Sequence, residues 1–211
     1  MKVAVSYLSS NRSILDTIKK INETKADYIH ADFMDGKYVK NNNISLKHWF
    51  YLRYAAKPLE IHLMVKNPLK YLKYLNGLNI RVVYIHYSAY FLNDITKILK
   101  KGYRPGLVIN PNDNLELLSK YFKYVDKVLV MGVTPGAGGQ KFIPDTLKTL
   151  KQINKYKLDN NLVFSVEVDG GINQETATKV SRYCDTIVSG SYVCKELDYN
   201  KPISQLKKPK K

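Results

Sequence analysis

Short β-branched or aliphatic runs alternate with longer segments of helical character along the whole 211-residue chain. In the first helical segment, Ile14, Ile18 and Ile21 recur every three or four residues, as on the buried face of a helix. Strands that alternate with helices form a parallel sheet covered by helices. The eight expected strands are Val3–Val5, Tyr28–Ala31, Leu59–Leu63, Val82–His86, Gly106–Asn110, Lys127–Met131, Phe164–Val168 and Thr186–Ser189. The expected helices are Ser13–Thr24, Ser45–Tyr54, Pro68–Leu75, Tyr90–Lys101, Asn114–Tyr121, Pro144–Tyr156 and Gln174–Arg182.

The number of these units decides between two architectures. Eight strand–helix units in one domain favour a closed (β/α)8 TIM barrel over an open, doubly wound sheet. A dinucleotide-binding sheet would carry a G-x-G-x-x-G turn after its first strand, and the segment SYLSSN at residues 6–11 lacks it. No linker divides the chain, so we expect a single domain over residues 1–211, with a short helix after Ser191 and a short basic tail from about residue 205.

Composition excludes several classes of protein. No apolar run approaches the ~20 residues that a membrane span needs, and the start of the chain lacks the apolar core of a signal peptide. The two cysteines, Cys184 and Cys194, cannot form a disulfide framework, which indicates a reducing compartment. We therefore expect a cytoplasmic protein without a membrane partner.

The formal net charge of +16 raises the question of nucleic-acid binding. Only five of the 34 basic residues are arginine, however, and the lysines are scattered along the chain. Surfaces that bind phosphates favour arginine mixed with lysine. Solvated lysine faces therefore explain the charge better than a nucleic-acid partner does. The positive field would steer an anionic substrate towards the protein.

Polar side chains gather where the expected strands end, which is the edge of a barrel that carries its chemistry. His30 and Asp32 are two residues apart, so an extended strand turns both into the barrel mouth. His62 ends the next strand, and Asp169 follows the seventh. Two imidazoles and two carboxylates form a donor set for one divalent cation, with Zn²⁺, Fe²⁺, Mn²⁺ and Co²⁺ all open. The other polar residues at strand ends are Ser6, Asp35, His86, Asn110 and Ser191.

Glycine-rich loops follow three neighbouring strands at the same edge. The loop at residues 132–141 reads GVTPGAGGQK, the seventh strand ends in DGG (169–171), and the eighth ends in SGS (189–191). Glycines allow backbone amides to approach an anion, and the loops after strands 7 and 8 are the recurrent phosphate position in such barrels. These loops predict a phosphate-binding site beside the cation site.

Seven stretches of the sequence resemble the ribulose-phosphate 3-epimerase family, in family order and over essentially the whole chain. They are SYLSSN (6–11), HADFMDGKYVKN (30–41), IHLMVKNP (61–68), GLVINP (106–111), VLVMGVTPGAGGQKF (128–142), VDGGIN (168–173) and SGS (189–191). Periodicity and composition indicate only a barrel with a polar, glycine-rich mouth. The reaction is what the resemblance implies.

The resemblance also implies a role for each matching position. The metal ligands would be His30, Asp32, His62 and Asp169, and the acid and base would be Asp32 and Asp169. The apolar floor under the reacting carbons of the enediolate would consist of Met34, Met64 and Met131. The remaining substrate contacts would come from Ser6, His62, Gly138, Gly139, Asp169, Gly170, Gly171, Gly190 and Ser191, most of them around the phosphate.

The implied activity is the metal-dependent interconversion of D-ribulose 5-phosphate and D-xylulose 5-phosphate through an enediolate. Inverting C3 removes a proton on one face and returns one on the other, so two carboxylates are needed. Asp32 and Asp169 would lie three strands apart around the ring, as that task requires. The partner is then a small phosphorylated ketose, with a hexulose phosphate such as allulose 6-phosphate as the alternative. We also expect a homo-oligomer.

Overall fold

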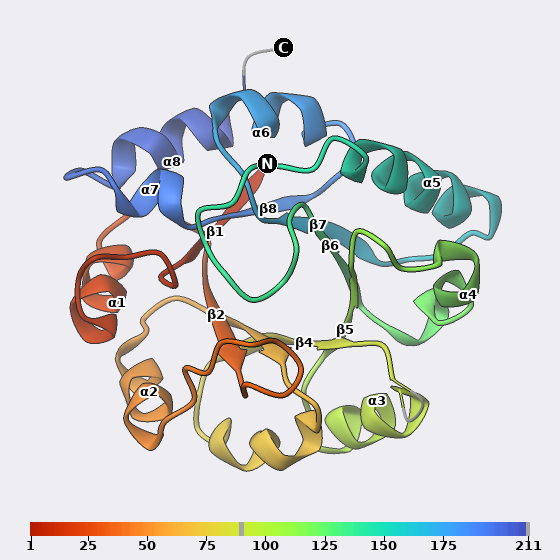
Figure 1. The fold of residues 1–211 in the computed structure, drawn as a ribbon, viewed down its shortest axis with the longest axis horizontal. Coiled ribbons are helices and arrows are strands. Elements are labelled where there is room, and N and C mark those ends of the chain that lie inside the picture. The colour runs from red at the N-terminus through yellow and green to blue at the C-terminus, as the bar shows by residue number, and fades with distance from the viewer. Residues whose placement is uncertain (89–90, 210–211) are drawn as a thin grey trace.

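Eight parallel strands close into a barrel in the computed structural model, which describes residues 1–88 and 91–209. Each strand pairs with its neighbours in sequence, and β8 pairs with β1. Figure 1 shows the helices as an outer ring around the strands. The predicted (β/α)8 TIM barrel is therefore confirmed. The strands are β1 (Lys2–Ser6), β2 (Tyr28–Met34), β3 (Leu59–Met64), β4 (Ile80–His86), β5 (Pro105–Ile109), β6 (Lys127–Met131), β7 (Ser165–Asp169) and β8 (Thr186–Ser189).

The helices follow the strands in the expected order. Ser13 caps α1 as predicted, because its side chain accepts a hydrogen bond from the amide of Asp16. The α-helices are α1 (Ile14–Asn22), α2 (Leu46–Tyr51), α3 (Phe91–Lys100), α4 (Leu115–Ser119), α5 (Thr146–Asp159), α6 (Gln174–Val180), α7 (Ser191–Cys194) and α8 (Asn200–Lys207). The 3-10 helices are η1 (Leu52–Tyr54), η2 (Pro68–Tyr74) and η3 (Phe122–Tyr124).

Two helical segments differ from the expectation at their proline residues. Pro68 opens η2, which is a 3-10 helix where we expected an α-helix. Pro144 lies in a turn ahead of α5, because the amides of Thr146 and Leu147 bond to carbonyls only three residues back. The start at Tyr90 of the fourth expected helix lies outside the described residues.

The C-terminal segment is more ordered than the sequence indicated. Two helices, α7 and α8, follow β8 where we expected one. The basic tail expected from about residue 205 instead begins as part of α8, where Leu206 is buried and Lys207 Nζ lies 2.8 Å from Asp27 Oδ2. Lys210 and Lys211 of that tail lie outside the described residues.

Strand alternation separates two cores. Residues such as Ala31 and Phe33 of β2 belong to the large core between the strands and the helices. The smaller core includes Ala4, Val108 and Leu129 and fills the barrel axis. β2 runs on to Met34 and places Asp32 towards this interior, and all seven of its residues are buried. In the described part of the chain, every helix is too short or too polar to cross a lipid bilayer.

Candidate active site and metal centre

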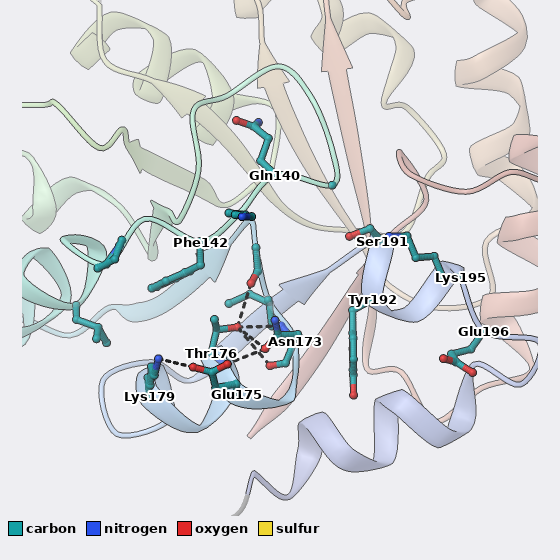
Figure 2. Close-up of a pocket in the computed structure, with 16 residues that line it drawn as sticks. Gln140, Phe142, Asn173, Glu175, Thr176, Lys179, Ser191, Tyr192, Lys195 and Glu196 are labelled. Atoms are coloured by element: carbon teal, nitrogen blue, oxygen red, sulfur yellow. Dashed lines mark hydrogen bonds and ion pairs between the residues drawn. The ribbon is translucent and has the colours of Figure 1, made fainter.

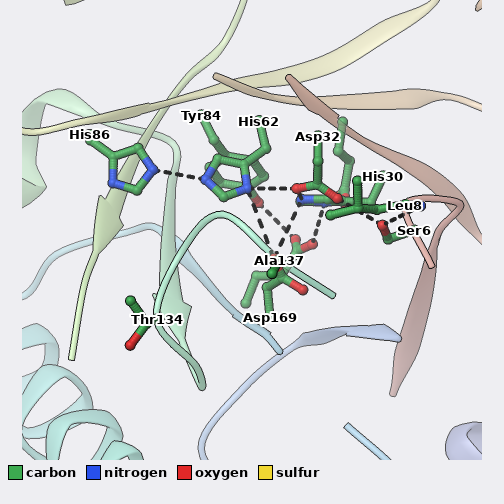
Figure 3. A network of polar contacts seen from close by, with 12 residues as sticks. Ser6, Leu8, His30, Asp32, His62, Tyr84, His86, Thr134, Ala137 and Asp169 are labelled. Atoms are coloured by element: carbon green, nitrogen blue, oxygen red, sulfur yellow. Dashed lines mark hydrogen bonds and ion pairs between the residues drawn. The ribbon is translucent and has the colours of Figure 1, made fainter. Parts of the chain in front are cut away.

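Four side chains meet at the carboxyl edge of the barrel (Figure 3). His30 and Asp32 come from β2, Asp169 ends β7, and His62 on β3 is the register partner of Asp32. Asp32 Oδ1 lies 3.0 Å from His62 Nδ1 and 3.5 Å from His30 Nε2. Asp169 Oδ2 lies 3.9 Å from both of these nitrogens. One ligand atom from each residue thus lies within 4.8 Å of the other three.

Each imidazole of this cluster has a polar contact on its other nitrogen. His62 Nε2 lies 3.0 Å from Nε2 of His86, and His30 Nδ1 lies 3.3 Å from Oε2 of Glu60. Burial and the neighbouring His62 hold the pKa of His86 well below its usual range. The contacts fix both rings with the remaining nitrogen turned into the cluster.

Two observations show that these residues fit a divalent cation. His30 Nε2 is buried, and within residues 1–88 and 91–209 it has no hydrogen-bond partner, a cost that a bound cation would remove. Two imidazole nitrogens and two carboxylate oxygens also form a donor set for Zn²⁺ and similar first-row ions. The cluster is therefore able to hold one such ion.

Charges within the cluster separate the pKa values of its two carboxyl groups. Burial, together with the Asp32 carboxylate, raises the pKa of Asp169 to about 7. Burial alone would also raise the pKa of Asp32, but His30 and His62 outweigh it and hold that pKa well below its usual range. Burial would lower the pKa of His30, but Asp32 and Asp169 raise it to about 9. At neutral pH the pair therefore combines an ionised carboxylate with a carboxyl that is able to hold a proton.

A cavity opens above the cluster and contains most of the expected substrate-binding residues. Met34 and His62 are exceptions, because both are buried and do not line this cavity. The expected residues that line it are Ser6, Asp32, Met64, Met131, Gly138, Gly139, Asp169, Gly170, Gly171, Gly190 and Ser191. The structure thus brings the acidic pair and the three glycine-rich loops to one space.

The loop after β7 is held in a conformation that glycine allows. Gly171 has φ +66°, and a Cβ at this position would lie 2.5 Å from the backbone nitrogen of Phe142. Thr176 Oγ1 donates a hydrogen bond of 3.0 Å to the carbonyl of Gly171, and Asn173 caps α6 by accepting from the Thr176 amide. Figure 2 shows this cap below Phe142, in a groove on the outer side of the loop.

The glycine-rich loop after β6 passes in front of the cluster, as Thr134 and Ala137 show in Figure 3. Gln140 closes this loop on itself, donating to the carbonyls of Thr134 at 2.7 Å and Ala137 at 2.8 Å. Asn41, in the loop after β2, donates a 2.7 Å hydrogen bond to the carbonyl of Gly136. The two loops therefore cover the mouth together.

Two other strand-end residues hold loops instead of joining the cluster. The carboxylate of Asp35 accepts hydrogen bonds from the amides of Lys37, Tyr38 and Lys66, each at 2.9 Å. Asn110 Nδ2 lies 3.2 Å from the hydroxyl of Tyr38. Both residues therefore shape the rim around the site.

Sequence reasoning missed the buried glutamates Glu60 and Glu167. A signal was present, because each stands two residues before a cluster member, His62 or Asp169, in a run of aliphatic residues. Spacing by two on a strand places both side chains on the same face. An acidic residue at such a position of a buried strand indicates a charged interior.

Comparison with known proteins gives one family. The family model described as "Ribulose-phosphate 3 epimerase family" matches residues 2–194. The ribulose-phosphate 3-epimerase of Bacillus subtilis is 34% identical, over 98% of each chain. That of Synechocystis is 32% identical, over 99% of this chain and 94% of the relative. Among solved structures, the tryptophan synthase α-subunit of Pyrococcus furiosus matches with a TM-score of 0.68 at 12% identity, over 98% of this chain and 96% of that one, which is a likeness of fold alone.

Proposed function

The chain belongs to the ribulose-phosphate 3-epimerase family, and we propose that it interconverts D-ribulose 5-phosphate and D-xylulose 5-phosphate by inverting C3 through an enediolate. It is an isomerase that acts on sugar phosphates. In barrels of this kind the chemistry takes place at the carboxyl edge of the strands, where this cavity lies, and the opposite end of the barrel contributes stability.

The placement of Asp32 and Asp169 carries this proposal. Both carboxyl groups line the same cavity, and they come from β2 and β7, which are separated around the ring by β1 and β8. One carboxylate removes the C3 proton from one face of the substrate, and the other, in its acid form, gives a proton to the opposite face. The two residues exchange roles in the reverse reaction.

The metal ligands in this proposal are His30, Asp32, His62 and Asp169. A divalent ion held there, whether Zn²⁺, Fe²⁺, Mn²⁺ or Co²⁺, would supply Lewis-acid stabilisation of the negative charge that develops on the substrate oxygens. The imidazoles hold their positions through His86 and Glu60 at the contacts described above.

Backbone and apolar groups orient the substrate. Amides of the three glycine-rich loops would bind the phosphate, with Ser6 in contact with the sugar, as the lining of the cavity supports. Met64 and Met131 give an apolar surface next to the acidic pair, with Met34 buried behind it. An anchored phosphate brings the C3 hydrogen, and no other, between the carboxylates.

Deuterium exchange tests the proposed reaction. We expect that ribulose 5-phosphate, incubated in D2O with metal-replete enzyme, yields xylulose 5-phosphate labelled at C3, detected by NMR. Failure to incorporate deuterium at C3 would overturn the proposal. The ratio of kcat/KM for ribulose 5-phosphate and allulose 6-phosphate separates the pentulose from the hexulose activity.

We also propose that the enzyme is a cytoplasmic homo-oligomer. Its two cysteines are free thiols, which supports a reducing compartment. Sedimentation velocity tests the oligomeric state, and a monomer at micromolar concentration would contradict it.

A further inference from the structure

Two buried glutamates lie below the metal cluster, inside the barrel. Glu60 of β3 and Glu167 of β7 have 0% and 1% of their surfaces exposed. Each stands two residues before a cluster member, His62 or Asp169, so strand alternation turns it towards the barrel axis. Neither lines the substrate cavity, so any effect on the reaction must act through another residue.

One arginine pairs with both of these glutamates. Arg81 of β4 forms an ion pair with Glu60 and lies 3.5 Å from Oε2 of Glu167. Tyr84 donates a hydrogen bond of 2.8 Å to the same Glu167 oxygen. The guanidinium of Arg81 also packs over the ring of Tyr28, 3.7 Å from its centre. Arg81 is thus fixed in place, and it holds the carboxylate of Glu60.

The carboxylate of Glu60 contacts the ring nitrogen of His30 that is turned away from the cluster. His30 Nδ1 lies 3.3 Å from Oε2 of Glu60 and 3.9 Å from Oε1 of Glu167. On the other side of the ring, Nε2 lies 3.5 Å from Oδ1 of Asp32. A carboxylate paired with arginine only accepts hydrogen bonds, so Nδ1 keeps its proton against Glu60, and Nε2 is the nitrogen that loses its proton when a cation binds.

We propose that Glu60, oriented by Arg81, is a positioning residue that fixes the ring and tautomer of His30 for cation binding. The inference rests on the proposed function in one respect, namely that the cluster binds a divalent cation. Glu167 contributes less to the orientation of His30, because it lies farther from His30 Nδ1 and accepts a hydrogen bond from Tyr84. Outer partners of this kind commonly change metal affinity about 10- to 100-fold.

Stability alone does not account for this buried network. A buried ion pair is costly to desolvate, and an apolar pair of similar volume often serves a fold equally well. The barrel interior already uses apolar residues such as Ala4, Val108 and Leu129. The two glutamates, in contrast, stand where they contact His30.

Cobalt binding to three variants tests the proposal. Glu60→Met removes the acceptor, Glu60→Gln keeps an acceptor oxygen without the charge, and Glu175→Met breaks an exposed ion pair with Lys179 as the matched control. Metal-free protein is titrated with Co²⁺, and the dissociation constant and the visible absorption bands are recorded. Melting temperatures of the metal-free proteins report on folding.

We expect Glu60→Met to bind Co²⁺ about 10- to 100-fold more weakly and with altered absorption bands. Glu60→Gln should recover most of the affinity and the wild-type spectrum, and Glu175→Met should match the wild type. A folded Glu60→Met protein with wild-type affinity and spectrum would overturn the proposal, as would a wild-type protein that binds no Co²⁺.

A second measurement covers the case in which Glu60→Met does not fold. Nitrogen-15 NMR of the Zn²⁺-loaded wild-type protein should show His30 protonated at Nδ1 and coordinated through Nε2, and coordination through Nδ1 would overturn the proposal. C3 deuteration by the wild type separates this inference from the reaction. A protein that binds Co²⁺ as expected but exchanges no C3 hydrogen contradicts the reaction alone.

Discussion

The hydroxyl of Ser6 donates a hydrogen bond of 2.7 Å to Oδ2 of Asp32 in the mouth of the barrel. The other oxygen of Asp32, Oδ1, lies 3.0 Å from His62 Nδ1. The same serine oxygen accepts the amide of Leu8 at 3.2 Å, which orients its proton towards Asp32. Ser6 therefore fixes the rotamer of a carboxylate that we propose as an acid and base.

Removing this hydroxyl should reduce activity without unfolding the protein. We expect Ser6→Ala to lower kcat/KM for ribulose 5-phosphate about 10- to 100-fold, the usual value of a hydrogen bond to a charged group. Ser13→Ala is the control, because Ser13 only caps α1 and should affect the melting temperature but not kcat/KM. Equal kcat/KM values for Ser6→Ala and the wild type would contradict the role of Ser6.

Both carboxyl groups of the acidic pair, Asp32 and Asp169, should be required for turnover. Asp32→Asn and Asp169→Asn each remove the proton acceptor on one face, so we expect kcat to fall about 10²- to 10⁴-fold. Circular dichroism should show the wild-type fold in both variants. Asp159→Asn, which loses only an exposed ion pair with Lys155, is the control and should turn over normally. A wild-type rate in either active-site variant would remove that residue from the mechanism.

Substitutions of Gly171 and Gly102 distinguish two effects, the strain of a positive φ angle and the close packing of Gly171 against Phe142. Both have positive φ, +66° and +79°, but a Cβ on Gly102 would have no heavy atom within 4 Å, whereas one on Gly171 would collide with Phe142. Gly102→Ala should therefore cost about 1 kcal/mol of unfolding free energy and leave KM unchanged. Gly171→Ala should cost more and raise KM for the phosphorylated substrate. Urea unfolding and steady-state kinetics measure the two effects, and equal effects of both substitutions would refute the assignment.

Local chemistry explains which features of the fold the sequence predicts. The β6 and β8 strands match their predicted ranges, Lys127–Met131 and Thr186–Ser189, because both are short aliphatic runs. The β2 strand extends three residues beyond the predicted Ala31, because Asp32 faces a charged interior that strand patterns do not reveal. The 3-10 form of η2 has no evident cause in its sequence.

The four residues of the candidate metal cluster could be predicted from the sequence, but the residues that orient them could not. The alternation of side chains along a strand and the positions of the strand ends predict His30, Asp32, His62 and Asp169, and the structure brings them together. The partner of His30 Nδ1 is Glu60, which lies 30 residues further along the chain. The register between β2 and β3 sets this pairing. Which nitrogen faces inward therefore required three-dimensional geometry.

Lys127 makes stability depend on pH. It lies in the barrel interior with 6% of its surface exposed, and burial lowers its pKa to about 8 although Glu167 opposes the shift. Between pH 8 and the ordinary value of 10.5, the unfolded chain binds more protons than the folded protein, so this residue makes the unfolding free energy rise with pH. Below pH 8 the cost of the buried charge is fully present.

Replacing this lysine should therefore stabilise the protein at neutral pH. We expect Lys127→Met to raise the unfolding free energy at pH 7 by up to about 3 kcal/mol, and the gain should shrink as the pH rises from 8 to 10.5. Urea unfolding at several pH values measures the difference from the wild type. A gain that does not change with pH would show that the titration of Lys127 is not its source.

Removal of the cation should affect both activity and stability, because the cluster buries the unpartnered Nε2 of His30 and two carboxyl groups next to one another. We expect chelation to abolish C3 exchange and to lower the melting temperature. Adding Zn²⁺, Fe²⁺, Mn²⁺ or Co²⁺ at about a thousandfold excess over Kd should restore about 4 kcal/mol of stability. His62→Ala is the paired variant, and its melting temperature should respond little to added metal. Full activity and an unchanged melting temperature after complete chelation would contradict the metal site, and activity with each restored ion identifies the one that serves best.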